Sequence, residues 1–153
     1  MSAIRKRYRI LVIEDNETDA ELIGKALQKY DVEHELVTLS DGEKALRYLD
    51  TLTSVPVPDL IVLDINMPRR DGLTVLVQYR MNVCLVRVPI IVLTSSDAPS
   101  DKTRAGIIGV SAFLQKPLLL EDFLALGERF KTILGTPFTF ADAQSTPPVQ
   151  DTP

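Results

Sequence analysis

The sequence predicts an α/β protein with a doubly wound, five-stranded parallel sheet, and three observations support this. Short runs rich in Ile, Val and Leu recur along the chain, and helical patterns follow most of them. The runs lack the apolar–polar alternation of half-exposed strands, so they suit strands covered on both faces. The length of 153 residues corresponds to about one domain, which can bury its own core.

Five segments are predicted to be strands. They are residues 10–13, 36–39, 60–63, 90–93 and, more weakly, 111–114. Because strands that alternate with helices form βαβ units, we expect all five to lie parallel in one sheet.

Five helices are predicted between and after these strands. They cover residues 17–30, 42–49 (opened by Asp41), 72–82, 99–108 and 119–134. The first carries Ala20, Ile23 and Leu27 on one stripe. Pro99 stands at a favourable first-turn position of the fourth helix. Gly135 is a C-terminal signal for the fifth.

The predicted domain organisation is one folded domain over residues 1–135 and a flexible tail over residues 136–153. The tail is rich in Pro, Ser and Thr, a composition typical of chains without a packed core. Only Phe138 and Phe140 could anchor part of it, and residues 141–153 are expected to be flexible.

Composition and charge argue against several kinds of function. The formal net charge is −4, so no basic field exists to attract nucleic acid or anionic lipid. No stretch approaches the roughly 20 apolar residues of a membrane helix, and the first apolar run is too short for a signal peptide. The lone Cys84 cannot form an internal disulfide and fits a reducing compartment. We therefore expect a cytoplasmic protein that binds neither nucleic acid nor membranes.

Acidic and polar residues stand where the predicted strands end. Glu14 and Asp15 follow the first strand, Asp64 the third, Thr94 the fourth, and Lys116 follows the fifth. In open parallel sheets the site lies at these carboxyl ends. Clustered carboxylates favour Mg²⁺, which prefers oxygen ligands, and a carboxylate can attack phosphorus. Each residue alone has an ordinary explanation, but together they indicate phosphoryl transfer assisted by Mg²⁺.

Four ordered segments resemble the receiver domain of bacterial two-component response regulators, particularly the stand-alone kind. They are residues 10–16 (ILVIEDN), 59–72 (DLIVLDINMPRRDG), 89–95 (PIIVLTS) and 116–117 (KP). The resemblance covers about residues 8–134 and implies a flavodoxin-like sheet with strand order 2-1-3-4-5. Within the stand-alone kind, the Glu14-Asp15-Asn16 segment and the short tail are most similar to regulators of the cyanobacterial-phytochrome type.

The resemblance implies roles for the acidic positions. Asp64 aligns with the phosphoacceptor. Asp15 aligns with a direct Mg²⁺ ligand, and Glu14 aligns with its acidic neighbour. Asn66 is implied to offer its backbone carbonyl to the metal.

The resemblance also implies how the site would respond to phosphorylation. Thr94 aligns with the hydroxyl that bonds the phosphoryl group, and Lys116 aligns with the lysine that pairs with the acceptor and its phosphate. Phe113 matches an aromatic residue whose rotamer accompanies signalling. The Lys116–Pro117 bond, usually cis in the family, is a candidate for a cis peptide.

The implied function is signalling by phosphorelay and not turnover of a substrate. A histidine kinase or phosphotransfer protein would supply the phosphoryl group, and the output would be association with a downstream protein. A homodimer through helix four, strand five and helix five is one such association. The wide apolar stripe of residues 119–134 fits either that surface or a deep core position against Phe138 or Phe140.

Two other functions are kept as alternatives. A degenerate receiver would act as a constitutive interaction module, although all five key positions are filled. An aspartyl-phosphate hydrolase would carry a DxDxT motif, in which the second acid serves as acid and base. The segment Asp64-Ile65-Asn66 lacks that acid.

Overall fold

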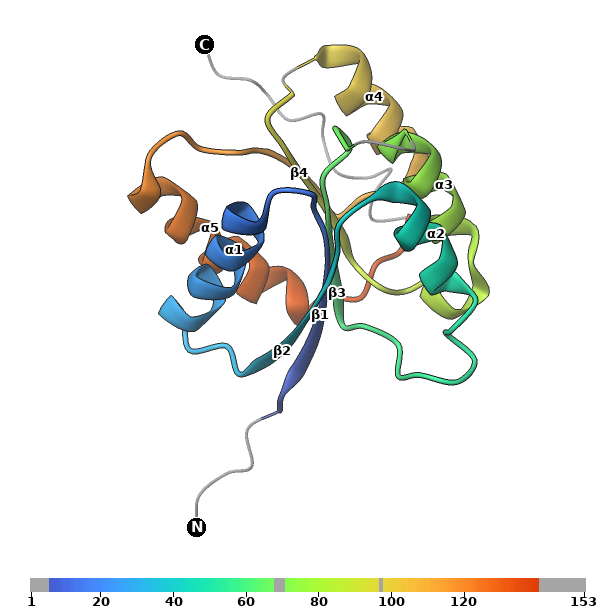
Figure 1. Cartoon of the computed structure of the whole chain (residues 1–153), viewed down its shortest axis with the longest axis horizontal. Helices are drawn as coiled ribbons and strands as arrows, with labels where there is room; N and C mark the ends of the chain where they lie inside the picture. The colour runs from blue at the N-terminus through green and yellow to red at the C-terminus, as the bar shows by residue number, and fades with distance from the viewer. Residues whose placement is uncertain (1–5, 68–70, 97, 141–153) are drawn as a thin grey trace.

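The computed structural model describes residues 6–67, 71–96 and 98–140, and in them five parallel strands form one sheet (Figure 1). The strands are β1 (Tyr8–Ile13), β2 (His34–Leu39), β3 (Leu60–Leu63), β4 (Ile90–Thr94) and β5 (Ala112–Gln115). Their order is β2-β1-β3-β4-β5, and every neighbouring pair is parallel. The predicted α/β class and the strand order are both confirmed.

The described residues form five α-helices and one short 3₁₀ helix, which lie between the strands and after the last one. They are α1 (Glu17–Lys29), α2 (Gly42–Leu49), α3 (Gly72–Met81), η1 (Val83–Leu85), α4 (Pro99–Ile108) and α5 (Leu120–Leu134). Every predicted helix is present, with its ends within one residue of the expected positions. In the described part of the chain, no helix has the length and apolar character needed to cross a membrane.

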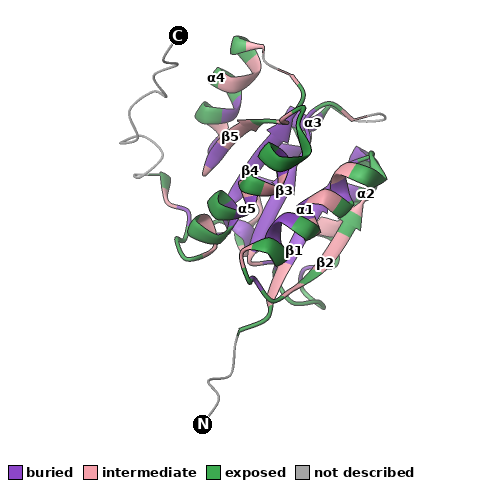
Figure 2. Ribbon diagram, turned by 90° about the vertical axis from the view of Figure 1, so that its left-hand side faces the viewer, coloured by how far each residue is buried: buried purple, intermediate pink, exposed green. Residues whose placement is uncertain are grey.

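The helices cover both faces of the sheet. Helices α1 and α5 lie on one face, and α2, α3 and α4 lie on the other (Figure 1). Figure 2 shows that the buried residues concentrate along the central strands. Every residue of β3 and β4 is buried, whereas the edge strand β2 is half-buried. This double covering explains why the apolar runs show no alternation.

The wide apolar stripe of α5 is largely explained by its packing against α1. Phe123 and Phe130 are buried in the core that α1 and α5 share with the sheet. Gly127 allows the close approach of the two helices, because a Cβ atom there would lie 2.1 Å from the Ala26 carbonyl oxygen. Leu120 at the start of the helix remains exposed.

The segment after α5 runs from the α5 layer to the α3 layer (Figure 1). The Phe138 N–H donates to the Arg87 carbonyl oxygen at 2.9 Å, and the Phe138 ring is only 5% exposed. Phe140 packs edge-to-face on Phe138 with the ring centroids 5.2 Å apart. Phe138 therefore anchors this segment against α3 and the α4–β5 turn. Residues 141–153, predicted to be flexible, lie outside the described residues.

Phe138 covers a buried arginine. The Arg80 guanidinium carbon lies 3.8 Å from the centre of the Phe138 ring. Arg80 donates to three backbone carbonyl oxygens, those of Gly109 (2.9 Å), Val88 (3.0 Å) and Leu85 (3.2 Å). One side chain thus connects the end of α3 to η1, to the entry of β4 and to the end of α4.

Candidate functional site

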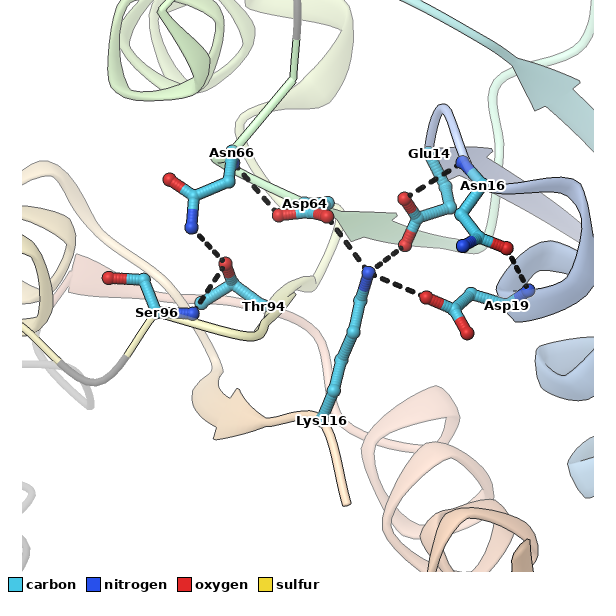
Figure 3. Close-up of polar contacts among 8 residues, drawn as sticks. All are labelled: Glu14, Asn16, Asp19, Asp64, Asn66, Thr94, Ser96 and Lys116. Atoms are coloured by element: carbon cyan, nitrogen blue, oxygen red, sulfur yellow. Dashed lines mark hydrogen bonds and ion pairs between the residues drawn. The ribbon is translucent and has the colours of Figure 1, made fainter. Parts of the chain in front are cut away.

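Hydrogen bonds of the sheet extend just beyond the strands and position the site. Asp64 N donates to the Ile13 carbonyl oxygen at 2.9 Å, and Lys116 N donates to the Thr94 carbonyl oxygen at 2.8 Å. Glu14 N is held in the same way by β2. Since the strands are parallel and in register, these residues meet at one edge of the sheet, as Figure 3 shows. Glu14, Asp64 and Thr94 are buried there, at 3%, 4% and 0% exposure.

Lys116 lies at the centre of the acidic residues. Its Nζ atom is 2.6 Å from Glu14 Oε1, 2.8 Å from Asp19 Oδ2 and 2.9 Å from Asp64 Oδ2 (Figure 3). An ammonium group has three N–H donors, so each donor has one carboxylate partner. These contacts hold three carboxyl groups together at a largely buried position.

Asp19 is a member of this cluster that the sequence analysis missed. It lies in the first turn of α1, where its N–H donates to the Asn16 side chain at 3.0 Å. The available signal was its position. A first-turn residue of the helix that follows β1 lies beside the same sheet edge as Glu14 and Asp15.

Hydrogen bonds fix both oxygens of Asp64. Oδ2 accepts from Lys116, and Oδ1 accepts from the Asn66 N–H at 2.8 Å. The carboxylate plane is therefore set before any ligand arrives. A fixed carboxylate at the edge of a sheet is suited to act as a nucleophile, because little reorganisation precedes the attack.

Thr94 is positioned as a hydrogen-bond donor. Its Oγ1 accepts from Asn66 Nδ2 and from the Ser96 N–H, both at 3.3 Å (Figure 3). A hydroxyl oxygen has two lone pairs and one hydrogen, so these two contacts leave the hydrogen to be donated. An anion bound next to Asp64 is the partner that this arrangement suits.

The pKa values of Glu14 and Lys116 are both raised, but for different reasons. Burial and the nearby Asp64 charge raise the pKa of Glu14 to about 7, although the Lys116 hydrogen bond opposes this shift. Burial alone would lower the pKa of Lys116, but its hydrogen bonds to Asp19, Glu14 and Asp64 raise it overall. Lys116 therefore stays charged and partly offsets the repulsion among the acids.

Three of the acids form a group that can hold a divalent cation. One carboxylate oxygen each from Glu14, Asp15 and Asp64 lies within 4.8 Å of the others, and Asp15 is exposed to solvent. Carboxylate oxygens are hard ligands that suit Mg²⁺, Mn²⁺ and Ca²⁺. The donor set therefore fits a divalent metal ion, and the sequence analysis named all three residues.

Phe113 lies apart from this polar cluster. It stands on β5 opposite Val92 of β4, is partly buried, and packs on the core of the α2–α4 layer. The Lys116–Pro117 bond, which the resemblance made a candidate for a cis peptide, is trans, because the described residues contain no cis peptide bond. The trans form agrees with the ordinary preference of X–Pro bonds, about 0.5–1 kcal/mol.

This fold and this acidic edge define a class of signalling domain. The family model for the response regulator receiver domain matches residues 10–126. The chain belongs to that family, and the receiver domain makes up most of it. Members of the family are regulators in two-component signalling that interact with histidine kinases and downstream partners, and they bind a divalent metal.

Individual relatives agree with this assignment. The chain is 34% identical over 120 residues to response regulator Rcp1 of Synechocystis, with 76% of this chain and 82% of the relative covered. It is 35% identical over 126 residues to the probable methanogenesis regulatory protein FilR2 of Methanothrix harundinacea, with 81% of each covered.

Solved structures agree as well. The phosphorylated cyanobacterial phytochrome response regulator RcpA superposes with a TM-score of 0.77 at 31% identity, covering 84% of this chain and 94% of that one. The Mn²⁺-bound form of Rcp1 gives a TM-score of 0.74 at 32% identity, covering 82% and 92%.

Proposed function

We propose that this protein is a response regulator that accepts a phosphoryl group on Asp64 from a phosphohistidine of a partner kinase or phosphotransfer protein. The observation that carries the proposal is the environment of Asp64. Its carboxylate is buried, fixed by two hydrogen bonds and adjacent to Lys116, Glu14 and Thr94. The phosphorylated protein would then signal by a changed association with another protein.

The proposed transfer uses residues whose geometry is described above. A carboxylate oxygen of Asp64 bonds to phosphorus as the phosphorus–nitrogen bond of the phosphohistidine breaks. Lys116 supplies positive charge to the transferring group, and Thr94 donates its hydroxyl hydrogen to a phosphoryl oxygen. Charge developing on the phosphoryl oxygens is thereby met by groups that are already in place.

Mg²⁺ is the proposed cofactor, held by Glu14, Asp15, Asp64 and the backbone carbonyl of Asn66. When bound, it would neutralise the carboxylates and the phosphoryl oxygens. The support is the separation of 4.8 Å or less among the oxygens of the three acids. The raised pKa of Glu14 agrees with this, because a buried carboxylate that lacks full compensation gains from a nearby cation.

The switch that we propose runs from Thr94 and Lys116 through β5 to Phe113 and α4. Lys116 N is bonded to the Thr94 carbonyl oxygen, so a shift of either residue acts on the pairing of β4 with β5. Helix α4 is weakly held, because Ala105 is its only buried residue and its N-cap Ala98 makes no side-chain cap bond. A helix with so few anchors is the element that phosphorylation would remodel most easily.

Exposed apolar residues support the proposed association surface of α4, β5 and α5. Ile107 on α4 is 77% exposed, and Leu118 and Leu119 between β5 and α5 are 102% and 67% exposed. Apolar groups left in water at these positions favour contact with a partner or a second copy of the chain. The proposal includes a cytoplasmic location and no nucleic-acid ligand.

Intact-mass measurement after incubation with Mg²⁺ and acetyl phosphate tests the proposal. The parent protein should gain one phosphoryl group that persists for minutes, and Asp64→Asn should gain none. The matched control is Asp59→Asn, because Asp59 lies at the opposite end of β3 and should leave the adduct unchanged. Absence of an adduct on the parent would instead support a degenerate receiver. Rapid multiple turnover of the donor would support a hydrolase.

A further inference from the structure

Asp19 contacts the centre of the site without belonging to the metal-binding group. Its Oδ2 lies 2.8 Å from Lys116 Nζ, and its side chain is 23% exposed. The Asn16 cap holds its backbone in the first turn of α1. The acids whose oxygens could share a metal ion are Glu14, Asp15 and Asp64, and Asp19 is not one of them. Asp19 contacts the site through Lys116.

The three donors of Lys116 are already occupied in this arrangement. A phosphoryl group on Asp64 brings new oxygen atoms that Lys116 must approach, so Lys116 has to release one carboxylate. The Glu14 and Asp64 side chains are 2% and 4% exposed, whereas the Asp19 side chain is 23% exposed, so water can hydrate Asp19 most easily when it loses Lys116. Asp19 is therefore the carboxylate that competes with the phosphoryl group for Lys116.

The negative charge of Asp19 also opposes phosphorylation of Asp64. Asp19 Oδ2 and Asp64 Oδ2 both lie within hydrogen-bond distance of one nitrogen atom. A negative charge this close to Asp64 opposes the additional negative charge of a phosphoryl group. The same charge favours a cation bound at the neighbouring carboxylates.

We propose that Asp19 is an inhibitory positioning residue that holds Lys116 in the unphosphorylated arrangement and thereby sets the phosphorylation equilibrium. The inference rests on the proposed function. It also gives α1 a role in the switch, because the Asp19–Lys116 ion pair joins the start of α1 to the end of β5. Transfer of Lys116 to the phosphoryl group would break that connection.

The test is Asp19→Asn, measured by calorimetric titration with two ligands in turn. Mg²⁺ alone should bind more weakly, because the site loses one negative charge. Beryllofluoride, a phosphoryl mimic, should bind more tightly at saturating Mg²⁺, because Lys116 gains a free donor and repulsion falls. We expect changes of roughly three- to tenfold in each affinity, the size of a partly exposed charge interaction.

Opposite signs for the two ligands distinguish this role from a structural one. A distorted site would weaken both ligands, and an irrelevant Asp19 would leave both unchanged, so either result would overturn the inference. Asp19→Glu keeps the charge and should restore the behaviour of the parent. Glu17→Gln removes the same charge from the same helical turn at an exposed residue that is not a partner of Lys116, and it should change neither affinity by more than about twofold.

The parent protein separates failure of this inference from failure of the proposed function. If the parent binds no beryllofluoride in the presence of Mg²⁺, the proposed function fails and the inference falls with it. If the parent binds it and Asp64→Asn does not, the proposed function holds. The comparison of Asp19→Asn with the parent then decides the role of Asp19 alone.

Discussion

Replacing Asp15 by Asn should make the metal-free protein more stable. The Asp15 carboxylate lies within 4.8 Å of oxygens of both Glu14 and Asp64. In the described site, Lys116 forms ion pairs with Glu14, Asp19 and Asp64. The positive charge of Lys116 therefore offsets the negative charge of Asp15 least directly. Asparagine has nearly the same volume as aspartate and removes this repulsion without leaving a cavity.

The expected gain follows from the separation of the charges. Two unit charges at this distance repel by about 0.9 kcal/mol in water, and by more at a lower effective dielectric. At pH 8, where Glu14 with its pKa of about 7 is also ionised, Asp15 faces two such carboxylates, and Lys116 offsets part of the repulsion. We expect a gain of about 1–2 kcal/mol in the free energy of unfolding, which corresponds to a rise in melting temperature of roughly 3–6 °C for a chain of this size.

Thermal melts with EDTA and with excess Mg²⁺ provide the measurement. Mg²⁺ should stabilise the parent more than Asp15→Asn, because the variant has lost an anionic oxygen ligand. Asp31→Asn is the control, since Asp31 is exposed and its left-handed backbone (φ 59°) also suits Asn. If Asp15→Asn melts below the parent in EDTA, the three carboxylates do not repel one another as argued here.

Three further predictions concern pH, packing and the switch. Burial raises the pKa of Glu14 from 4.5 to about 7, so the folded state binds more protons than the unfolded state between these values. The metal-free protein should therefore lose about 1–3 kcal/mol of stability as pH rises from 5 to 8, and urea unfolding of Glu14→Gln should show a flatter profile. Gly127→Ala forces a Cβ atom against the Ala26 carbonyl and should lower the free energy of unfolding by about 1–3 kcal/mol, whereas Gly106→Ala, which meets open space in α4, should raise it slightly. In the parent, beryllofluoride should change the free energy of self-association, measured by sedimentation, by about 1–3 kcal/mol. Phe113→Ala should reduce this change, and an unchanged response would make Phe113 a core residue only.

The fold was predictable because its strands are covered on both faces. Uniformly apolar runs between amphipathic segments leave few architectures other than a doubly wound sheet. The starts of two strands were predicted less well. β1 begins at Tyr8 and β2 at His34, each two residues before its apolar run, since the less apolar residues there still pair with each other. Periodicity alone does not detect such pairing.

The candidate site was predictable to the extent that its residues follow strands. Glu14, Asp64 and Lys116 could be placed at one edge because parallel strands end together. The first-turn position of Asp19 also places it beside this edge, but its contact with Lys116 could not be predicted, because that contact depends on how the first turn of α1 is oriented. The position of Arg80 on one stripe of α3 with Leu73 and Leu76 could be predicted from the helical spacing. Its three carbonyl partners could not, because they come from segments that only the folded chain brings together.

The Phe138 ring affects where this domain can be cut or joined to another protein. A fragment ending at Gly135 would retain every strand and helix named above for the described residues but would lose the aromatic face over Arg80. Among the described residues, Arg80 Nη2 has no hydrogen-bond partner, so that face is the favourable contact available to it. A reporter or an output module fused to this chain therefore belongs after Phe140, where the linker starts from a docked segment and leaves the guanidinium covered.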